Sequence, residues 1–186
     1  MSKEYTIRRK VLTLFGAKFH IYNSSGDLIG FSKQKAFKLK EDIRIYTDES
    51  MSDERLLIAA RSVIDFSAAY DVVDSRTGET VGTLRRKGLS SMFRDTWEVM
   101  DNDGYSAGHL REDSAFYAFI RRFGLSFLPQ HFHLDDADGN EVAQFRTHFN
   151  PFVHKMTVIV HDETSLPPML ILAAGILLVA IEGRQQ

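Results

Sequence analysis

Four stretches of the chain repeat one pattern, in which an alternating run leads into a polar turn with glycine and a second alternating run follows. They are "FHIYNSSGDLIGFSKQK" (19–35), "YDVVDSRTGETVGTLRRK" (70–87), "WEVMDNDGYSAGHLRE" (97–112) and "HFHLDDADGNEVAQFRTHF" (131–149). Asp and Asn hydrogen-bond their own backbone and glycine adopts positive φ without steric cost, so such turns are typical of β-hairpins. The spacing is too irregular for a solenoid or a propeller. The pattern therefore predicts an antiparallel meander that closes on itself.

Other segments fill the gaps between these hairpins. Strands are expected at residues 4–15, with or without a break, and at 36–48, 55–69 and 151–163, with 55–69 as one long or bent strand. The segment "SAFYAFIRRFG" (114–124) predicts a helix, because Ser114 suits the N-cap and Gly124 lies just past the end. Its apolar residues recur at i, i+3, i+4 and i+7, which is typical of one buried helix face.

An apolar run near the C-terminus, "LPPMLILAAGILLVAIEG" (166–183), predicts a second helix over 166–181. Such a run is typical of a membrane tail, but a helix over 166–181 is only about 24 Å long, and a bilayer core is about 30 Å thick. A closed sheet of about ten to twelve strands also encloses more space than its own side chains fill. A helix that is apolar on every side must be buried. We therefore expect it inside the barrel, with core positions at Leu170, Ala173, Gly175 and Leu177.

Composition limits the class of protein. A chain of 186 residues with 44% hydrophobic and 26% charged residues is expected to form one globular domain over 1–186. Without cysteine, disulfides, thiol nucleophiles and Cys-based metal sites are excluded. The N-terminal residues lack the features of a secretory signal, so a cytoplasmic location is expected. A net charge of -2 offers no general attraction for nucleic acid, so no nucleic-acid partner is expected. The protein is expected to be a monomer.

Charge is distributed unevenly along the chain. Residues 1–46 contain ten Lys and Arg residues but only four acidic residues. Two interpretations of this basic section remain open. It either faces phosphates or anionic lipid, or it places lysines in alternation on the solvent side of strands.

The best functional candidate in the sequence is "RRKGLSSMFR" (85–94), where Arg85, Arg86, Lys87 and Arg94 flank apolar residues. Cations beside exposed apolar side chains suit a phosphate head group at a membrane surface. The alternative is a solvated strand end and loop.

Catalytic and metal motifs are absent from the sequence. "DDADGNE" (135–141) resembles a calcium loop but lacks the glycine and glutamate spacing of an EF-hand, so a hairpin turn is expected there. His131 and His133 share one strand face without matched acidic ligands, and no metal site is predicted. There is no Gly-x-Ser-x-Gly elbow and no phosphate loop. We expect no enzyme and no cofactor.

The block "YDVVDSRTGETVGTLRRKG…W" (70–97), the turn "D-x-D-G-N-E-V-A-x-F" (136–145) and the terminal apolar helix resemble the LURP-one-related family. That family belongs to the superfamily of phospholipid scramblases and the tubby C-terminal domain. The resemblance implies a mainly β fold, a closed twelve-stranded barrel around a central C-terminal helix. Scramblases carry an Asp-rich calcium segment before the last helix, whereas this chain has "VHDETSLPP" (160–168) there.

The resemblance implies a non-catalytic binding or scaffold domain that binds phospholipid or phosphoinositide head groups at a membrane surface. A cytoplasmic protein of this kind would associate with the membrane peripherally. Two alternatives remain open, a protein-interaction module without lipid affinity and a C-terminal tail-anchored membrane protein.

Overall fold

The protein is described by a computed structural model that covers residues 2–10, 17–34, 42–62, 68–87, 96–113, 130–148 and 153–182. These residues form twelve strands and a helix. The elements are β1 (Lys3–Lys10), β2 (Ala17–Tyr22), β3 (Leu28–Gln34), β4 (Ile43–Tyr46), β5 (Glu54–Ser62), β6 (Ala69–Asp74), β7 (Thr80–Arg86), β8 (Thr96–Met100), β9 (Ser106–Glu112), β10 (His131–Asp136), β11 (Glu141–His148), β12 (Val153–Val160) and α2 (Pro168–Glu182).

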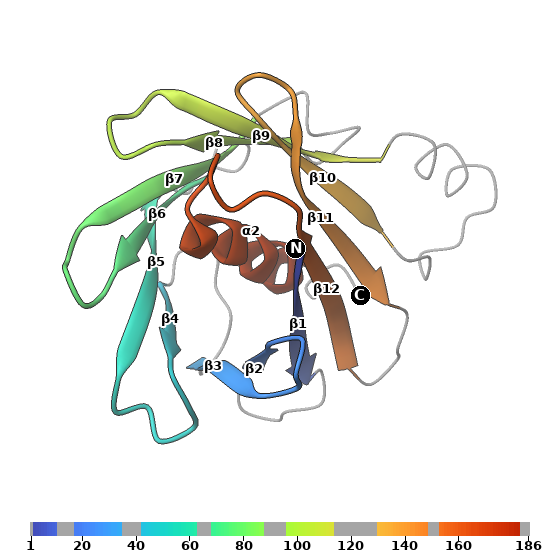
Figure 1. Cartoon of the computed structure of the whole chain (residues 1–186). Helices are drawn as coiled ribbons and strands as arrows, with labels where there is room; N and C mark the ends of the chain where they lie inside the picture. Colours follow the sequence, from blue (N-terminus) through green and yellow to red (C-terminus); the bar gives the residue numbers. More distant parts are fainter. Residues whose placement is uncertain are drawn as a thin grey trace.

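The strands form a closed antiparallel barrel in which each strand pairs with its neighbours in sequence (Figure 1). Pairing of β1 with β12 closes the sheet, with Lys3 opposite Val160 and Lys10 opposite Val153. A closed sheet has no exposed edge strand, which removes the main route to strand-to-strand aggregation. The predicted closed meander and the mainly β fold class are confirmed.

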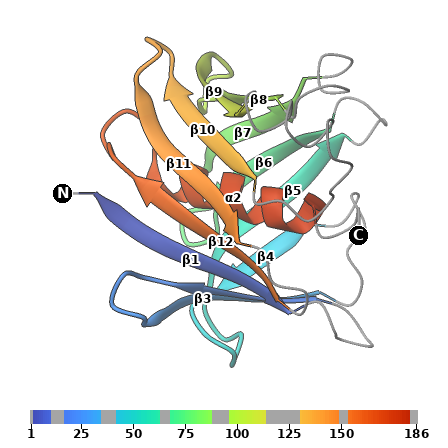
Figure 2. The same ribbon diagram turned by 90° about the vertical axis from the view of Figure 1, so that its right-hand side faces the viewer.

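The predicted hairpin turns lie at one end of the barrel, which Figure 2 shows from the side. In each of these four turns, an Asp or Asn side chain accepts a hydrogen bond from a backbone N–H group two or four residues further along the chain. For example, Asp136 Oδ1 accepts a hydrogen bond from the N–H of Asn140 at 2.8 Å. Each turn also contains a glycine with φ between 74° and 87°. These are the two properties of the turn sequences that predict the hairpins.

Helix α2 fills the interior of the barrel (Figure 1). Leu170, Ala173, Gly175 and Leu177 are all buried, and the helix packs against strands on both sides of the closing β1–β12 seam and against β6 and β7. The apolar surface of the run is therefore covered by the sheet, as the core-helix prediction requires. The membrane-tail alternative loses its basis, because the barrel already buries that surface.

The helix begins at Pro168 rather than at Leu166. The carbonyl of Pro167 accepts hydrogen bonds from the N–H groups of Leu170 and Ile171, at 2.9 and 3.2 Å, which makes Pro167 the residue that caps the first turn. A residue that precedes proline is disfavoured in the helical conformation, and this explains why Leu166 and Pro167 stay outside. Leu166 is nevertheless buried, with 2% of its surface exposed. No helix within the described ranges is long and apolar enough to cross a membrane.

Four strand predictions differ from the structure in their bounds. The prediction of one strand over 55–69 is wrong, because β5 ends at Ser62 and Ala69 already belongs to β6, directly opposite Ser62. Hydrophobicity alone cannot show where an antiparallel partner begins. The strands predicted at 4–15 and 36–48 are described only in part, as β1 and β4, and the strand predicted at 151–163 is shorter, as β12. The helix predicted at 114–124 lies outside the described residues.

Candidate anion-binding groove

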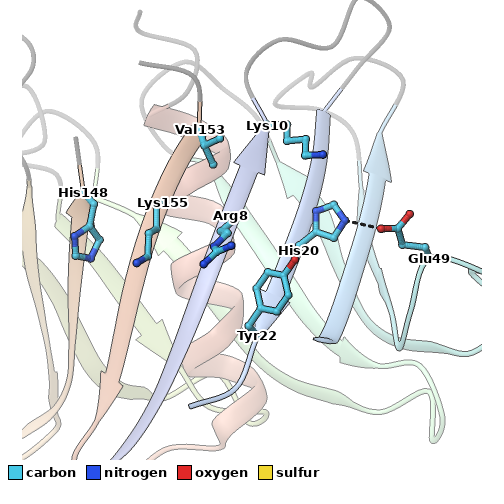
Figure 3. Close-up of a pocket in the computed structure, with 8 residues that line it drawn as sticks. All are labelled: Arg8, Lys10, His20, Tyr22, Glu49, His148, Val153 and Lys155. Carbon is cyan, nitrogen blue, oxygen red and sulfur yellow. Dashed lines mark hydrogen bonds and ion pairs between the residues drawn. The ribbon is translucent and has the colours of Figure 1, made fainter. Parts of the chain in front are cut away.

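A groove of about 610 Å³ lies on the outer wall of the barrel, and we call it the basic groove (Figure 3). Strands β1, β2, β11 and β12 and the turn between β4 and β5 contribute its lining residues. These are Arg8, Lys10, His20, Tyr22, Glu49, His148, Val153 and Lys155.

Cross-strand register brings four of the lining residues into one row. Lys155 lies opposite both His148 and Arg8, and Arg8 lies opposite His20, so the row runs across β11, β12, β1 and β2. All four side chains point outward, since their neighbours Ile7, Phe19, Met156 and Thr147 alternate to the other face of the pleat. Figure 3 shows the row side by side on neighbouring strands. Residues from opposite ends of the chain therefore meet on one surface.

The cations of the basic groove have no acidic partner among the described residues. Within the described part of the chain, Arg8, Lys10 and Lys155 form no ion pair, and Arg8 instead stacks over the Tyr22 ring, with its guanidinium carbon 5.0 Å from the ring centroid. Arg8 and Lys155 are directly opposite each other, an arrangement of like charges that destabilises a sheet. A bound anion would relieve this repulsion.

Four arginines on the other walls of the barrel are paired with carboxylates. Arg44 contacts Glu54 and Arg61 contacts Asp71, each at 2.8 Å, and Arg85 and Arg111 pair with Glu98 and Asp135. These four arginines are thus paired with carboxylates, whereas the three cations of the basic groove form no ion pair within the described ranges.

A single carboxylate, that of Glu49, lines the groove. It lies 2.9 Å from the His20 ring, which attaches the β4–β5 turn to β2. The hydrogen bond with His20 lowers the pKa of Glu49, so the carboxylate stays charged. His20 also packs edge-on against Phe31, which points outward but is only 2% exposed. The three Lys and Arg side chains of the groove outnumber this one carboxylate, so the groove is positive.

His148 closes the other side of the groove. Its Nε2 lies 2.8 Å from the hydroxyl of Thr157, which orients the ring. Partial burial lowers the pKa of His148, and the nearby Lys155 lowers it further. The ring is therefore neutral at neutral pH and available to hydrogen-bond a ligand.

The patch predicted at residues 85–94 is only partly described. Arg85 pairs with Glu98, and the Lys87 amine lies 4.0 Å from the same carboxylate. The hydrogen bond from Arg85 lowers the pKa of Glu98. Arg86 is half-buried, and Arg94 lies outside the described residues.

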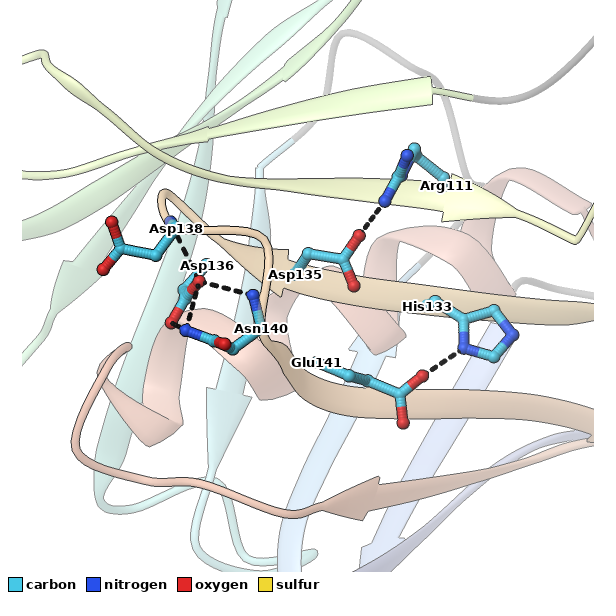
Figure 4. A network of polar contacts seen from close by, with 7 residues as sticks. All are labelled: Arg111, His133, Asp135, Asp136, Asp138, Asn140 and Glu141. Carbon is cyan, nitrogen blue, oxygen red and sulfur yellow. Dashed lines mark hydrogen bonds and ion pairs between the residues drawn. The ribbon is translucent and has the colours of Figure 1, made fainter.

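The segment "DDADGNE" forms the β10–β11 turn (Figure 4). The Asp136 carboxylate accepts hydrogen bonds from the N–H groups of Asp138 and Asn140, so its oxygens are used within the turn. His133 bonds Glu141 instead of forming a site with His131. No group of three or more His, Asp or Glu residues in the described ranges is placed to hold a metal ion.

Sequence reasoning identified the basic section but not the groove. Arg8, Lys10 and Lys18 belong to that section and alternate on the solvent side of β1 and β2, which is the simpler of the two interpretations. Lys155 and His148 come from distant parts of the chain. Only the closing β1–β12 register places them beside Arg8.

Comparisons with known proteins give one match. Neither the search of curated proteins nor the search of solved structures found a match. The model of the family described as LURP-one-related matches residues 29–179, which is most of the chain. The fold agrees, since the resemblance implied a twelve-stranded barrel around a C-terminal helix and both are observed. The protein therefore belongs to the LURP-one-related family.

Proposed function

We propose that this protein is a non-catalytic binding domain that holds a phosphate-bearing anion, in the first place a phospholipid head group, in the basic groove. The observation that carries the proposal is the absence of ion pairs at Arg8, Lys10 and Lys155 within the described residues, whereas arginines on other walls, such as Arg44 and Arg61, are paired. The family and the fold support a non-enzymatic role.

The chemistry of the groove suits a phosphate. An arginine and two lysines supply several N–H donors to one region, and charge-assisted hydrogen bonds to phosphate are stronger than neutral ones. The Arg8 guanidinium lies over the Tyr22 ring, and this contact limits the orientations that Arg8 adopts before binding. A groove open to solvent is screened by salt, so binding should weaken as ionic strength rises.

The test is vesicle flotation with phosphatidylcholine alone and with added phosphatidylglycerol. Wild type should float only with the anionic vesicles, and an Arg8→Ala/Lys155→Ala variant should lose most of this binding. The matched control is Arg44→Ala/Arg61→Ala, which removes the same charge from a wall where the cations are paired. An Arg85→Ala/Arg86→Ala/Lys87→Ala variant tests the patch proposed at 85–94 in the same assay.

A second arm separates lipid from soluble phosphate. Inorganic phosphate is titrated into wild type and into the Arg8→Ala/Lys155→Ala variant by calorimetry. Binding of inorganic phosphate without binding to vesicles would assign the groove to a soluble anion. Equal flotation of wild type and the groove variant would refute the proposed site. If wild type binds neither vesicles nor phosphate, the protein-interaction alternative replaces the proposal.

A further inference from the structure

A second row of cations continues the basic groove toward one end of the barrel. Lys10 lies opposite Val153 on one side and opposite Lys18 on the other, and Lys18 lies opposite Lys33. The row therefore crosses β12, β1, β2 and β3. Each lysine is two residues from an outward-facing neighbour in the same strand, so all three point away from the core. We call Lys10, Lys18 and Lys33 the lysine row.

The lysine row has a shape that fits a surface better than one small ligand. Adjacent strands are about 4.8 Å apart, which places the outer lysines roughly 10 Å from each other along a line. Within the described ranges, none of the three lysines forms an ion pair. Cations in a straight line cannot all converge on one phosphate, but they match an array of head groups.

The opposite end of the barrel carries the opposite charge. Six described turns lie there, at residues 23–27, 47–53, 75–79, 101–105, 137–140 and 161–167. Apart from Glu49, which contacts His20 in the basic groove, they contain nine carboxylates and one arginine, Arg76. The order of the strands places these turns at one end, and Figure 2 shows the β2–β3 and β10–β11 turns at its left. Lys10 and Lys33 are at or near the other ends of their strands. An anionic surface would attract one end and repel the other.

The geometry points to a defined docking orientation, in which the lysine row lies against an anionic bilayer and the acidic hairpin turns face away from it. This inference rests on the proposed function and adds the partner, a lipid surface, and the face that meets it. A juxtamembrane cation contributes enough attraction that removing one weakens partition about fivefold, so removing all three should weaken it on the order of a hundredfold.

Fluorescence quenching in full-length protein tests the orientation directly. The chain has no cysteine, so single cysteines can be labelled without a background. Val153→Cys places a fluorophore at the end of the lysine row, Ser24→Cys at the far end of the same wall, and Thr77→Cys in the β6–β7 turn. The vesicles contain phosphatidylcholine, phosphatidylglycerol and a nitroxide-labelled lipid that quenches at short range.

Docking as inferred should quench the Val153 label and leave the Ser24 and Thr77 labels bright. If the label at position 24 or 77 is quenched as strongly as the label at position 153, or more strongly, the inferred orientation is wrong. This holds even if wild type binds vesicles and the Arg8→Ala/Lys155→Ala variant does not, a result that would still support the proposed function. Lack of vesicle binding by wild type would overturn both the orientation and the proposed lipid function. A Lys10→Gln/Lys18→Gln/Lys33→Gln variant, shown to be folded by its thermal transition, should lose binding; full retention would also overturn the inference.

Discussion

Gly175 provides the sharpest test of how the central helix packs. It lies in the middle of α2, and a Cβ atom at this position would lie 2.9 Å from Cδ1 of Ile7, 3.1 Å from Cγ2 of Val158 and 3.3 Å from Cε1 of Phe145. These three side chains come from β1, β12 and β11, which are neighbours in the sheet. The helix and the barrel therefore approach each other closely at the closing seam.

Two opposing effects decide the outcome of Gly175→Ala. Alanine stabilises a helix interior by about 1 kcal/mol relative to glycine. An extra methyl in a close-packed core costs about 1–3 kcal/mol when its neighbours cannot move freely. Because three side chains from three strands crowd the position, we expect the second effect to be larger. The free energy of unfolding should fall by about 1 kcal/mol.

A double-mutant cycle with Ile7→Val isolates the contact. Removing Cδ1 of Ile7 from the wild type should cost about 0.5–1.5 kcal/mol. In the Gly175→Ala background the same change removes the closest clash, so it should cost less or even stabilise the protein. Residues in contact show coupling energies of about 0.5–3 kcal/mol. Urea denaturation followed by the fluorescence of the buried Trp97 measures each variant.

Ile58→Val, at a fully buried position on β5, serves as the control for the cycle. No atom of Ile58 lies among the nearest neighbours of the Gly175 position, so its effect should add to that of Gly175→Ala within about 0.5 kcal/mol. If Gly175→Ala is instead more stable than wild type and both cycles are additive, the helix does not pack against the β1–β12 seam as described.

Four further predictions follow from the barrel and its surface. Deleting 166–186 removes seven buried Leu, Ile and Val side chains, whose burial contributes roughly 10–21 kcal/mol against a typical total stability of about 5–15 kcal/mol. Circular dichroism should therefore show an unfolded chain, and a folded truncated protein would contradict the core-helix assignment. Glu49→Gln removes a carboxylate from the groove and should strengthen vesicle binding up to about fivefold, whereas Glu54→Gln should not. The depressed pKa of His148 means that the folded state binds fewer protons, so thermal stability should fall as the pH drops below 6.5 and fall less in His148→Asn. Hydroxyl and backbone donors lower the pKa of Asp162 to about 2, so Asp162→Asn should reduce the thermal midpoint at neutral pH, and the difference should vanish as the pH falls from 3.8 to about 2.

Much of the fold follows from local sequence signals. The Asp or Asn and the glycine of each hairpin turn are adjacent in sequence, and their conformational preferences act over a few residues, so the turns can be predicted directly. The need for a buried helix follows from the number of predicted strands. A closed sheet of this size leaves interior space that only the apolar run at 166–183 can fill. The end of β5 could not be predicted, because Ser62 and Ala69 are both compatible with a strand and only pairing separates them.

The candidate site depended on information that is not local. Alternation predicts that Arg8 and Lys10 face solvent, but it does not say which strand lies beside β1. Lys155 becomes part of the basic groove only through the register of the closing seam. A shift of that register by one residue would turn Lys155 toward the core. Sequence patterns therefore show which segments are basic, and the pairing of β1 with β12 brings their side chains together in the groove.

The position of α2 also bears on how the protein is made. A ribosome releases the first eleven strands before β12 and the helix, so the interior surface of the sheet has no partner during most of synthesis. At about 5–20 residues per second, the nascent chain would carry this apolar surface for many seconds. Chains interrupted before the helix would have no means to complete their core, and they would be natural targets for chaperones and proteases. Synthesis of the helix is thus the step that commits the chain to its native state.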